Sequence, residues 1–165
     1  SIDLGGQPDA VAISPDQAYA AIAIENERDE DLGDGEPPQM PAGFLVIVNT
    51  SGDVADWTTK RVELTSLEGA EYPTDPEPEY VSINSQNIAA VTLQENNAIV
   101  LVDLATASVT KSFSAGRVDL TMVDTVEDDI IDQSSTLSQV PREPDGVTWI
   151  SNTMLATADE GDLDG

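Results

Sequence analysis

The feature that most constrains the fold of this chain is an internal repeat. Three segments each begin with an acidic residue and continue into a short apolar run, and they start at Asp9, Glu79 and Asp145. In each repeat a second apolar run follows after a turn cluster, which predicts an antiparallel hairpin. In the first two repeats, two more strand-like runs follow before the next repeat begins. A repeated unit of four antiparallel strands is typical of a propeller blade.

The sequence therefore predicts an all-β fold, namely a β-propeller fragment of about two and a half four-stranded antiparallel blades. No stretch keeps a helical apolar period beyond two turns, and runs such as 44–48 are rich in β-branched residues. A propeller needs at least four blades to close its ring. We therefore expect the remainder of a longer propeller, or another chain, to cover the open sheet edges.

The repeat also predicts the boundaries of the structural units. Blade one carries an acidic insertion, and a second acidic insertion or linker precedes the last half-blade. The expected units are 1–76 for blade one with the insertion at 27–43, 77–116 for blade two, 117–142 for the second insertion, and 143–165 for the first half of blade three.

Charge restricts the classes of partner. The chain has 32 Asp and Glu residues against 6 Lys and Arg, which gives a net charge of −26. Such a surface repels nucleic acid and anionic membranes, and it favours divalent cations as partners. The absence of Cys and His excludes disulfides, Cys/His zinc sites and a Ser-His-Asp triad within this chain.

Hydropathy predicts no segment that spans a membrane. No apolar run approaches the roughly 18 residues that a spanning helix needs. The first twenty residues lack the charged start and continuous apolar core of a signal peptide. We therefore expect residue 1 to be either a mature N-terminus or the edge of a fragment.

The hairpins predict a ring of carboxylates. The residue that enters the first strand of a hairpin lies beside the residue that leaves the second strand, and the first strand of each blade lines the central channel. Carboxylates gathered there need a compensating cation, and calcium, with 6–8 oxygen ligands, suits this all-oxygen set. The predicted calcium ligands are Asp9, Glu25, Glu27, Glu79, Glu95, Asp145, Glu160 and Asp162, with carbonyl oxygens from Asn26 and Asn96.

Two alternatives remain open for these acidic residues. Each carboxylate can simply satisfy a turn or face water, because runs of like charge are usually solvated loops. The run from Glu160 through Asp162 to Asp164 and Gly165 resembles the front half of an EF-hand-type calcium loop. A plain acidic turn explains the same residues.

Arg142 is conspicuous because basic residues are so scarce. It lies between Pro141 and Pro144, directly before the third repeat, and these prolines stiffen the segment. An arginine among carboxylates commonly pairs with one of them. Alternatively, Arg142 binds a phosphate or another oxyanion together with calcium.

Several segments resemble a known family. They are "GQPDAVAISPDQAYAAIAIENERDED", "PAGFLVIVNT", "DPEPEYVSIN", "AAVTLQENNAIVLVDL" and "VPREPDGVTWISN". They are similar to propeller proteins described by an esterase-like activity of phytase, often named alkaline phosphatase or choice-of-anchor I domain proteins, and to mesenchyme-specific cell-surface glycoproteins. The resemblance covers nearly the whole chain. It implies a secreted, extracellular or cell-surface propeller that is longer than 165 residues.

Two functions follow as expectations. One is a secreted, calcium-dependent phosphoesterase of the alkaline phosphatase or phytase kind, in which carboxylates hold calcium and Arg142 steadies the phosphate. The other is a non-catalytic extracellular propeller that uses calcium and its acidic surface for adhesion, or for contact with matrix or mineral. The excess of acidic residues outside the predicted channel favours the second.

Overall fold

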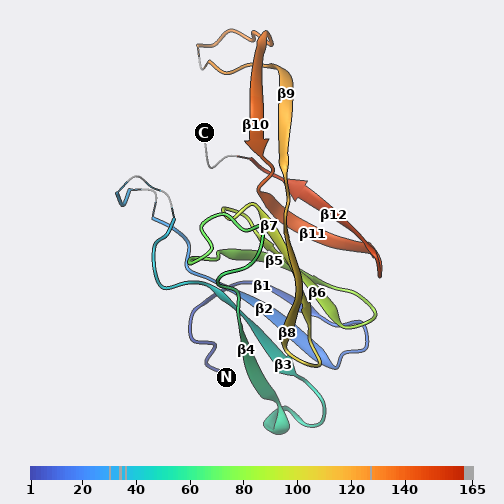
Figure 1. The fold of residues 1–165 in the computed structure, drawn as a ribbon. Helices are drawn as coiled ribbons and strands as arrows, with labels where there is room; N and C mark the ends of the chain where they lie inside the picture. Colours follow the sequence, from blue (N-terminus) through green and yellow to red (C-terminus); the bar gives the residue numbers. More distant parts are fainter. Residues whose placement is uncertain (30, 34, 36, 127, 162–165) are drawn as a thin grey trace.

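The chain folds entirely from β-strands joined by turns and one short 3-10 helix, η1 (Val54–Asp56), within the residues that the structure describes. The structure is a computed structural model, and it describes residues 1–29, 31–33, 35, 37–126 and 128–161. It contains antiparallel four-stranded sheets arranged as part of a propeller-like fold (Figure 1). The predicted fold class is therefore confirmed.

Two sheets have the strand order of propeller blades, in which each strand pairs with the next along the chain. The first contains β1 (Gln7–Ile13), β2 (Tyr19–Glu25), β3 (Phe44–Asn49) and β4 (Thr58–Glu63). The second contains β5 (Pro78–Ile83), β6 (Ile88–Leu93), β7 (Ala98–Asp103) and β8 (Ser108–Ser114). A third, two-stranded sheet pairs β11 (Pro144–Ser151) with β12 (Met154–Asp159).

The first hairpin of each of these three sheets has a bulge at the same place. The register shifts between Pro8 and Val11 in β1, between Pro78 and Val81 in β5, and between Pro144 and Gly146 in β11. These intervals contain Asp9, Glu79 and Asp145, the residues that mark the repeat. A bulge leaves a residue out of the regular ladder and redirects its side chain. The repeat therefore specifies a local distortion as well as a strand.

The core lies between the faces of the two complete sheets. Apolar side chains of both sheets form one buried cluster, which includes Leu45 and Ile47 of β3, Val91 of β6 and Val100 of β7. The first strand of the second sheet, β5, contacts both β1 and β11 (Figure 1). The beginnings of the three repeats are thereby brought together.

The linker between the sheets is fixed by a buried amide. Asn96, in the turn between β6 and β7, is fully buried. Its Nδ2 donates to the carbonyl oxygens of Glu71 and Asp75, each at 2.9 Å, and its Oδ1 accepts from the backbone N–H of Glu77 at 2.8 Å. Gly43, at the start of β3, packs so closely on this linker that a side-chain carbon there would overlap Pro76 and Pro78.

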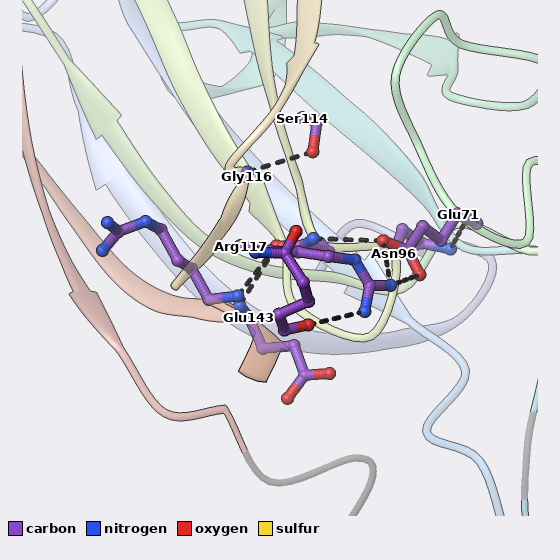
Figure 2. Close-up of polar contacts among 9 residues, drawn as sticks. Glu71, Asn96, Ser114, Gly116, Arg117 and Glu143 are labelled. Atoms are coloured by element: carbon purple, nitrogen blue, oxygen red, sulfur yellow. Dashed lines mark hydrogen bonds and ion pairs between the residues drawn. The ribbon is translucent and has the colours of Figure 1, made fainter. Parts of the chain in front are cut away.

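The segment 117–142, predicted as an acidic insertion or linker, forms a projecting hairpin. Its strands are β9 (Arg117–Val123) and β10 (Ser135–Pro141), which pair antiparallel in a sheet of their own (Figure 1). At its base the guanidinium of Arg117 reaches the Glu71 carboxylate at 2.8 Å (Figure 2). It also donates to the carbonyl oxygen of Gln139 at 3.0 Å. The acid content of this segment concealed its apolar alternation, so these strands were not predicted.

Candidate metal centre

Five carboxylates gather where β2 ends and β5 begins. They form two groups of three: Asp9, Glu25 and Glu79, and Glu25, Glu77 and Glu95. Within each group, one carboxylate oxygen from every member lies within 4.8 Å of those from the other two. Glu25 belongs to both groups. We call these five residues the carboxylate cluster.

Different elements position each member of the cluster. Asp9 and Glu79 lie in the bulges of β1 and β5, and Glu25 is the last residue of β2. Glu95 lies in the turn between β6 and β7, and Glu77 directly precedes β5 on the linker held by Asn96. The exposed fraction is 8% for Glu25 and 0% for Glu77. Glu25 and Glu77 are therefore the buried members of the cluster, whereas Asp9 is exposed.

Burial and mutual repulsion raise the pKa values of four cluster members, Asp9, Glu25, Glu77 and Glu79. Burial, together with the charges of Glu79 and Asp9, raises the pKa of Glu25 to about 9. Burial, with a smaller contribution from the charge of Glu95, raises the pKa of Glu77 to about 8, although Arg28 acts in the opposite direction. Burial raises the pKa of Glu79 to about 7. At neutral pH such a site has to retain protons or bind a cation.

Within the described residues the buried Glu77 carboxylate is only partly compensated, because burial raises its pKa by more than the charge and the backbone of Arg28 lower it. Neither of its carboxylate oxygens accepts a hydrogen bond of standard geometry from the described part of the chain. A buried carboxylate in this condition is costly unless a cation or a proton satisfies it. Because one of its oxygens approaches those of Glu25 and Glu95, Glu77 is directed into the cluster.

Arg28 brings positive charge to one side of the cluster. Its Nε lies 3.8 Å from a carboxylate oxygen of Glu95, and its Nη1 donates to the carbonyl oxygen of Gly35 at 2.9 Å. A single guanidinium offsets one of the five carboxylates. This role of Arg28 was not predicted from the sequence, because Arg28 lies at the start of an acidic insertion.

The structure brings four of the predicted ligands together, namely Asp9, Glu25, Glu79 and Glu95. Other predicted ligands lie around them. The pKa of Asp9 is raised by burial first, then by the charge of Glu27 and, more weakly, by that of Asp145. The charge of Asp145 also contributes to the raised pKa of Glu79. Neither Asp145 nor Glu27 belongs to the two groups found among the described residues.

The remaining predicted ligands are engaged elsewhere or lie outside the described residues. Glu160 accepts a hydrogen bond from the side-chain amide of Gln94 at 2.9 Å. Asn26 donates to the carbonyl oxygen of Gln39 at 2.8 Å, and both ends of the Asn96 amide hold the linker. Asp162, and the EF-hand-like run that it belongs to, lie outside the described residues.

Arg142 pairs with a carboxylate in this structure. Its Nη1 lies 3.1 Å from Oδ2 of Asp159, and its backbone N–H donates to the carbonyl oxygen of Gly116 at 3.2 Å. This is the commoner of the two arrangements that the sequence left open. The pair is partly exposed, so it contributes little to stability.

Glu77 is the one cluster member that was not predicted from the sequence, although the sequence contains a signal for it. Each repeat begins with a polar or acidic residue, a proline and an acidic residue: Gln7-Pro8-Asp9, Glu77-Pro78-Glu79 and Glu143-Pro144-Asp145. Glu77 occupies the first position of its tripeptide. Alignment of the three tripeptides draws attention to that position, which in the third repeat is the equally buried Glu143.

The fold and the carboxylate cluster define an acidic, propeller-like β domain. The chain belongs to the choice-of-anchor I domain family, whose model matches residues 1–165. Membership of this family implies an extracellular or cell-surface protein. No helix in the described part of the chain has the length and apolar character needed to cross a membrane.

Comparison with individual proteins adds little to this assignment. No curated protein matches the chain. Among solved structures, the chain is similar to hydrazine synthase of Kuenenia stuttgartiensis, with 16% identity and a TM-score of 0.43. That similarity covers 59% of this chain and 26% of the other. A likeness at this level does not bear on function.

Proposed function

We propose that this chain is the calcium-binding part of an extracellular propeller domain, and that the carboxylate cluster is its calcium site. The observation that carries the proposal is Glu77, which is fully buried, accepts no hydrogen bond of standard geometry from the described residues and is directed at two further carboxylates. The chain has no His or Cys, so every side-chain ligand is an oxygen. Calcium prefers such ligands and tolerates the irregular geometry of a site built from bulges and turns.

For the use of the bound calcium we propose a structural and adhesive role. Calcium there would tie β1, β2, the linker and the turn after β6 together, because each of them contributes a carboxylate. The acidic residues outside the cluster would then be available for contact with matrix or mineral. The phosphoesterase alternative relies on Arg142 as the phosphate ligand, and that guanidinium is paired with Asp159.

Thermal unfolding of the full-length protein tests calcium binding. Ligand bound only by the folded state stabilises it by about 2.7 kcal/mol at a hundredfold excess over Kd. For a domain of this size, we expect the melting temperature to rise by roughly 5–10 °C when calcium replaces chelator. The rise should be absent in the double variant Glu25→Gln, Glu95→Gln, and it should persist in Glu68→Gln, which changes an exposed carboxylate.

Two results would argue against this function. An unchanged melting temperature, combined with stabilisation of Glu25→Gln, Glu95→Gln in chelator, would identify the cluster as a solvated acidic surface. Hydrolysis of a generic phosphomonoester that depends on calcium and is lost in Arg142→Gln would favour the phosphoesterase instead of the adhesive role.

A further inference from the structure

The two groups of the carboxylate cluster each have the dimensions of one ion site. Calcium lies about 2.3–2.6 Å from its oxygen ligands, so opposite ligands of one ion are about 5 Å apart. The ligand atoms of Asp9, Glu25 and Glu79 fall within 4.8 Å of one another, and so do those of Glu25, Glu77 and Glu95. The groups share Glu25 and differ in their other members.

Charge indicates how many ions the cluster requires. If all five members are ionised they carry five negative charges, and Arg28 at Glu95 offsets one of them. One divalent cation would leave two of these negative charges uncompensated, in a site where Glu25 and Glu77 are buried. Two divalent cations and Arg28 together balance the five carboxylates. On the side away from Asp9, Glu77 and Glu95 carry two of these charges and Arg28 offsets one, while neither oxygen of the fully buried Glu77 accepts a hydrogen bond of standard geometry from the described residues.

On the basis of the calcium site proposed above, we propose that the cluster binds two divalent cations and that the Glu25 carboxylate bridges them. One oxygen of Glu25 faces the ion held by Asp9 and Glu79, and the other faces the ion held by Glu77 and Glu95. Pairs of metal ions in proteins commonly lie about 3.5–4 Å apart. Such a bridge makes Glu25 a ligand whose loss affects both ions.

The test is equilibrium dialysis of the full-length protein at a free calcium concentration that just saturates the wild type. It measures how many calcium ions each variant binds, compared with the wild type. We expect Asp9→Asn with Glu79→Gln to lose one ion, and Glu77→Gln with Glu95→Gln to lose one. Glu25→Gln alone should lose two. The control Glu68→Gln should lose none, since Glu68 is exposed and lies outside both groups.

The outcomes separate the two proposals. If none of the cluster variants loses an ion, calcium binding at the cluster fails and the bridge fails with it. If Glu25→Gln loses a single ion, or if combining the two double variants removes only one, the cluster binds one ion and the bridge is overturned while calcium binding stands.

A measurement on the wild-type protein removes the dependence on variants that fail to fold. The protein is loaded with Mn²⁺ in place of calcium and studied by electron paramagnetic resonance. Two Mn²⁺ ions bridged by a carboxylate give an exchange-coupled spectrum, which we expect at full loading. A six-line spectrum of isolated Mn²⁺ at every loading would overturn the bridge.

Discussion

At the scale of single residues, the molecule is governed by carboxylates in unfavourable surroundings. Glu25, Glu77 and Glu79 all have pKa values raised by burial first and by neighbouring acids second. Elsewhere the acids are satisfied by ordinary means. Asp16, for example, accepts hydrogen bonds from the side chains of Asn87 and Ser14, which lower its pKa to about 2. What distinguishes the cluster carboxylates from the other acids is therefore their burial and their closeness to one another, and not the residue type.

The raised pKa values predict how the metal-free protein responds to pH. An unfolded glutamate loses its proton near its ordinary pKa of 4.5, whereas Glu77 and Glu25 keep theirs up to about 8 and 9. Between these limits the folded state binds more protons than the unfolded state, so stability falls as pH rises. We expect the free energy of unfolding to decrease from pH 5 to pH 9 in metal-free protein.

Urea unfolding at a series of pH values measures this dependence. Glutamine at positions 25 and 77 does not titrate, so Glu25→Gln, Glu77→Gln should show a shallower decline. Added calcium should also reduce the decline, because it replaces the protons. A stability that rises over this pH range in the metal-free wild type would contradict the electrostatic description of the cluster.

At the scale of elements, the site depends on turns and bulges more than on strands. The bulges at Asp9 and Glu79 and the turn at Glu95 bring side chains of two sheets to one place. The linker is the least regular of these parts. Asn96 holds it through hydrogen bonds with Glu71, Asp75 and Glu77.

Asn96→Ala should therefore weaken the site without removing a ligand. The substitution leaves buried backbone groups of the linker without partners, and each such loss costs about 1–3 kcal/mol. We expect the free energy of unfolding to fall by about 3 kcal/mol and calcium affinity to fall as Glu77 loses its position. Urea unfolding and calcium titration measure the two effects.

The control for this substitution is Asn152→Ala. Asn152 is exposed, and its side-chain oxygen accepts one hydrogen bond from the hydroxyl of Ser85. Its removal should change stability by less than about 1 kcal/mol and leave calcium affinity as it was. Equal effects of the two alanine substitutions would show that Asn96 does not position the linker.

At the scale of the whole molecule, neighbouring sheets decide what is buried. Val81 in β5 is 3% exposed, whereas Val11, at the matching position of β1, is 66% exposed. The difference arises because β5 lies between β1 and β11. We also predicted that further polypeptide covers the exposed side of β1 and the open edge of the sheet of β11 and β12. This stays a prediction.

The net charge of −26 predicts a strong response to monovalent salt. Repulsion within a compact acidic molecule destabilises it, and salt screens that repulsion. In metal-free protein we expect the melting temperature to rise with sodium chloride, mostly between about 0.01 and 0.2 M, where the screening length falls steeply. Differential scanning calorimetry measures this dependence. A rise that begins only near molar salt would indicate solute exclusion instead of screening.

The sequence by itself determined the features that recur locally. The repeated starts at Asp9, Glu79 and Asp145 predicted all-β sheets in blade order and the meeting of Asp9, Glu25, Glu79 and Glu95, because strand pairing follows from alternation and from short connections. The pairing within each hairpin needed only the order of strands and the geometry of a hairpin, and the meeting of the two hairpins needed in addition the rule that the first strand of each blade lines the channel.

Only the tertiary structure decided the rest. The aligned tripeptides mark the position of Glu77, but its approach to the cluster is fixed by contacts such as those of Asn96, and Arg28 reaches the cluster along an irregular segment that no repeat marks. The hairpin of β9 and β10 was likewise hidden, because the acidic residues of its segment resemble those of a solvated loop. The burial of Glu25 and Glu77 was also decided by the tertiary structure. The packing of sheets that are distant in the sequence removed water from both side chains and raised their pKa values.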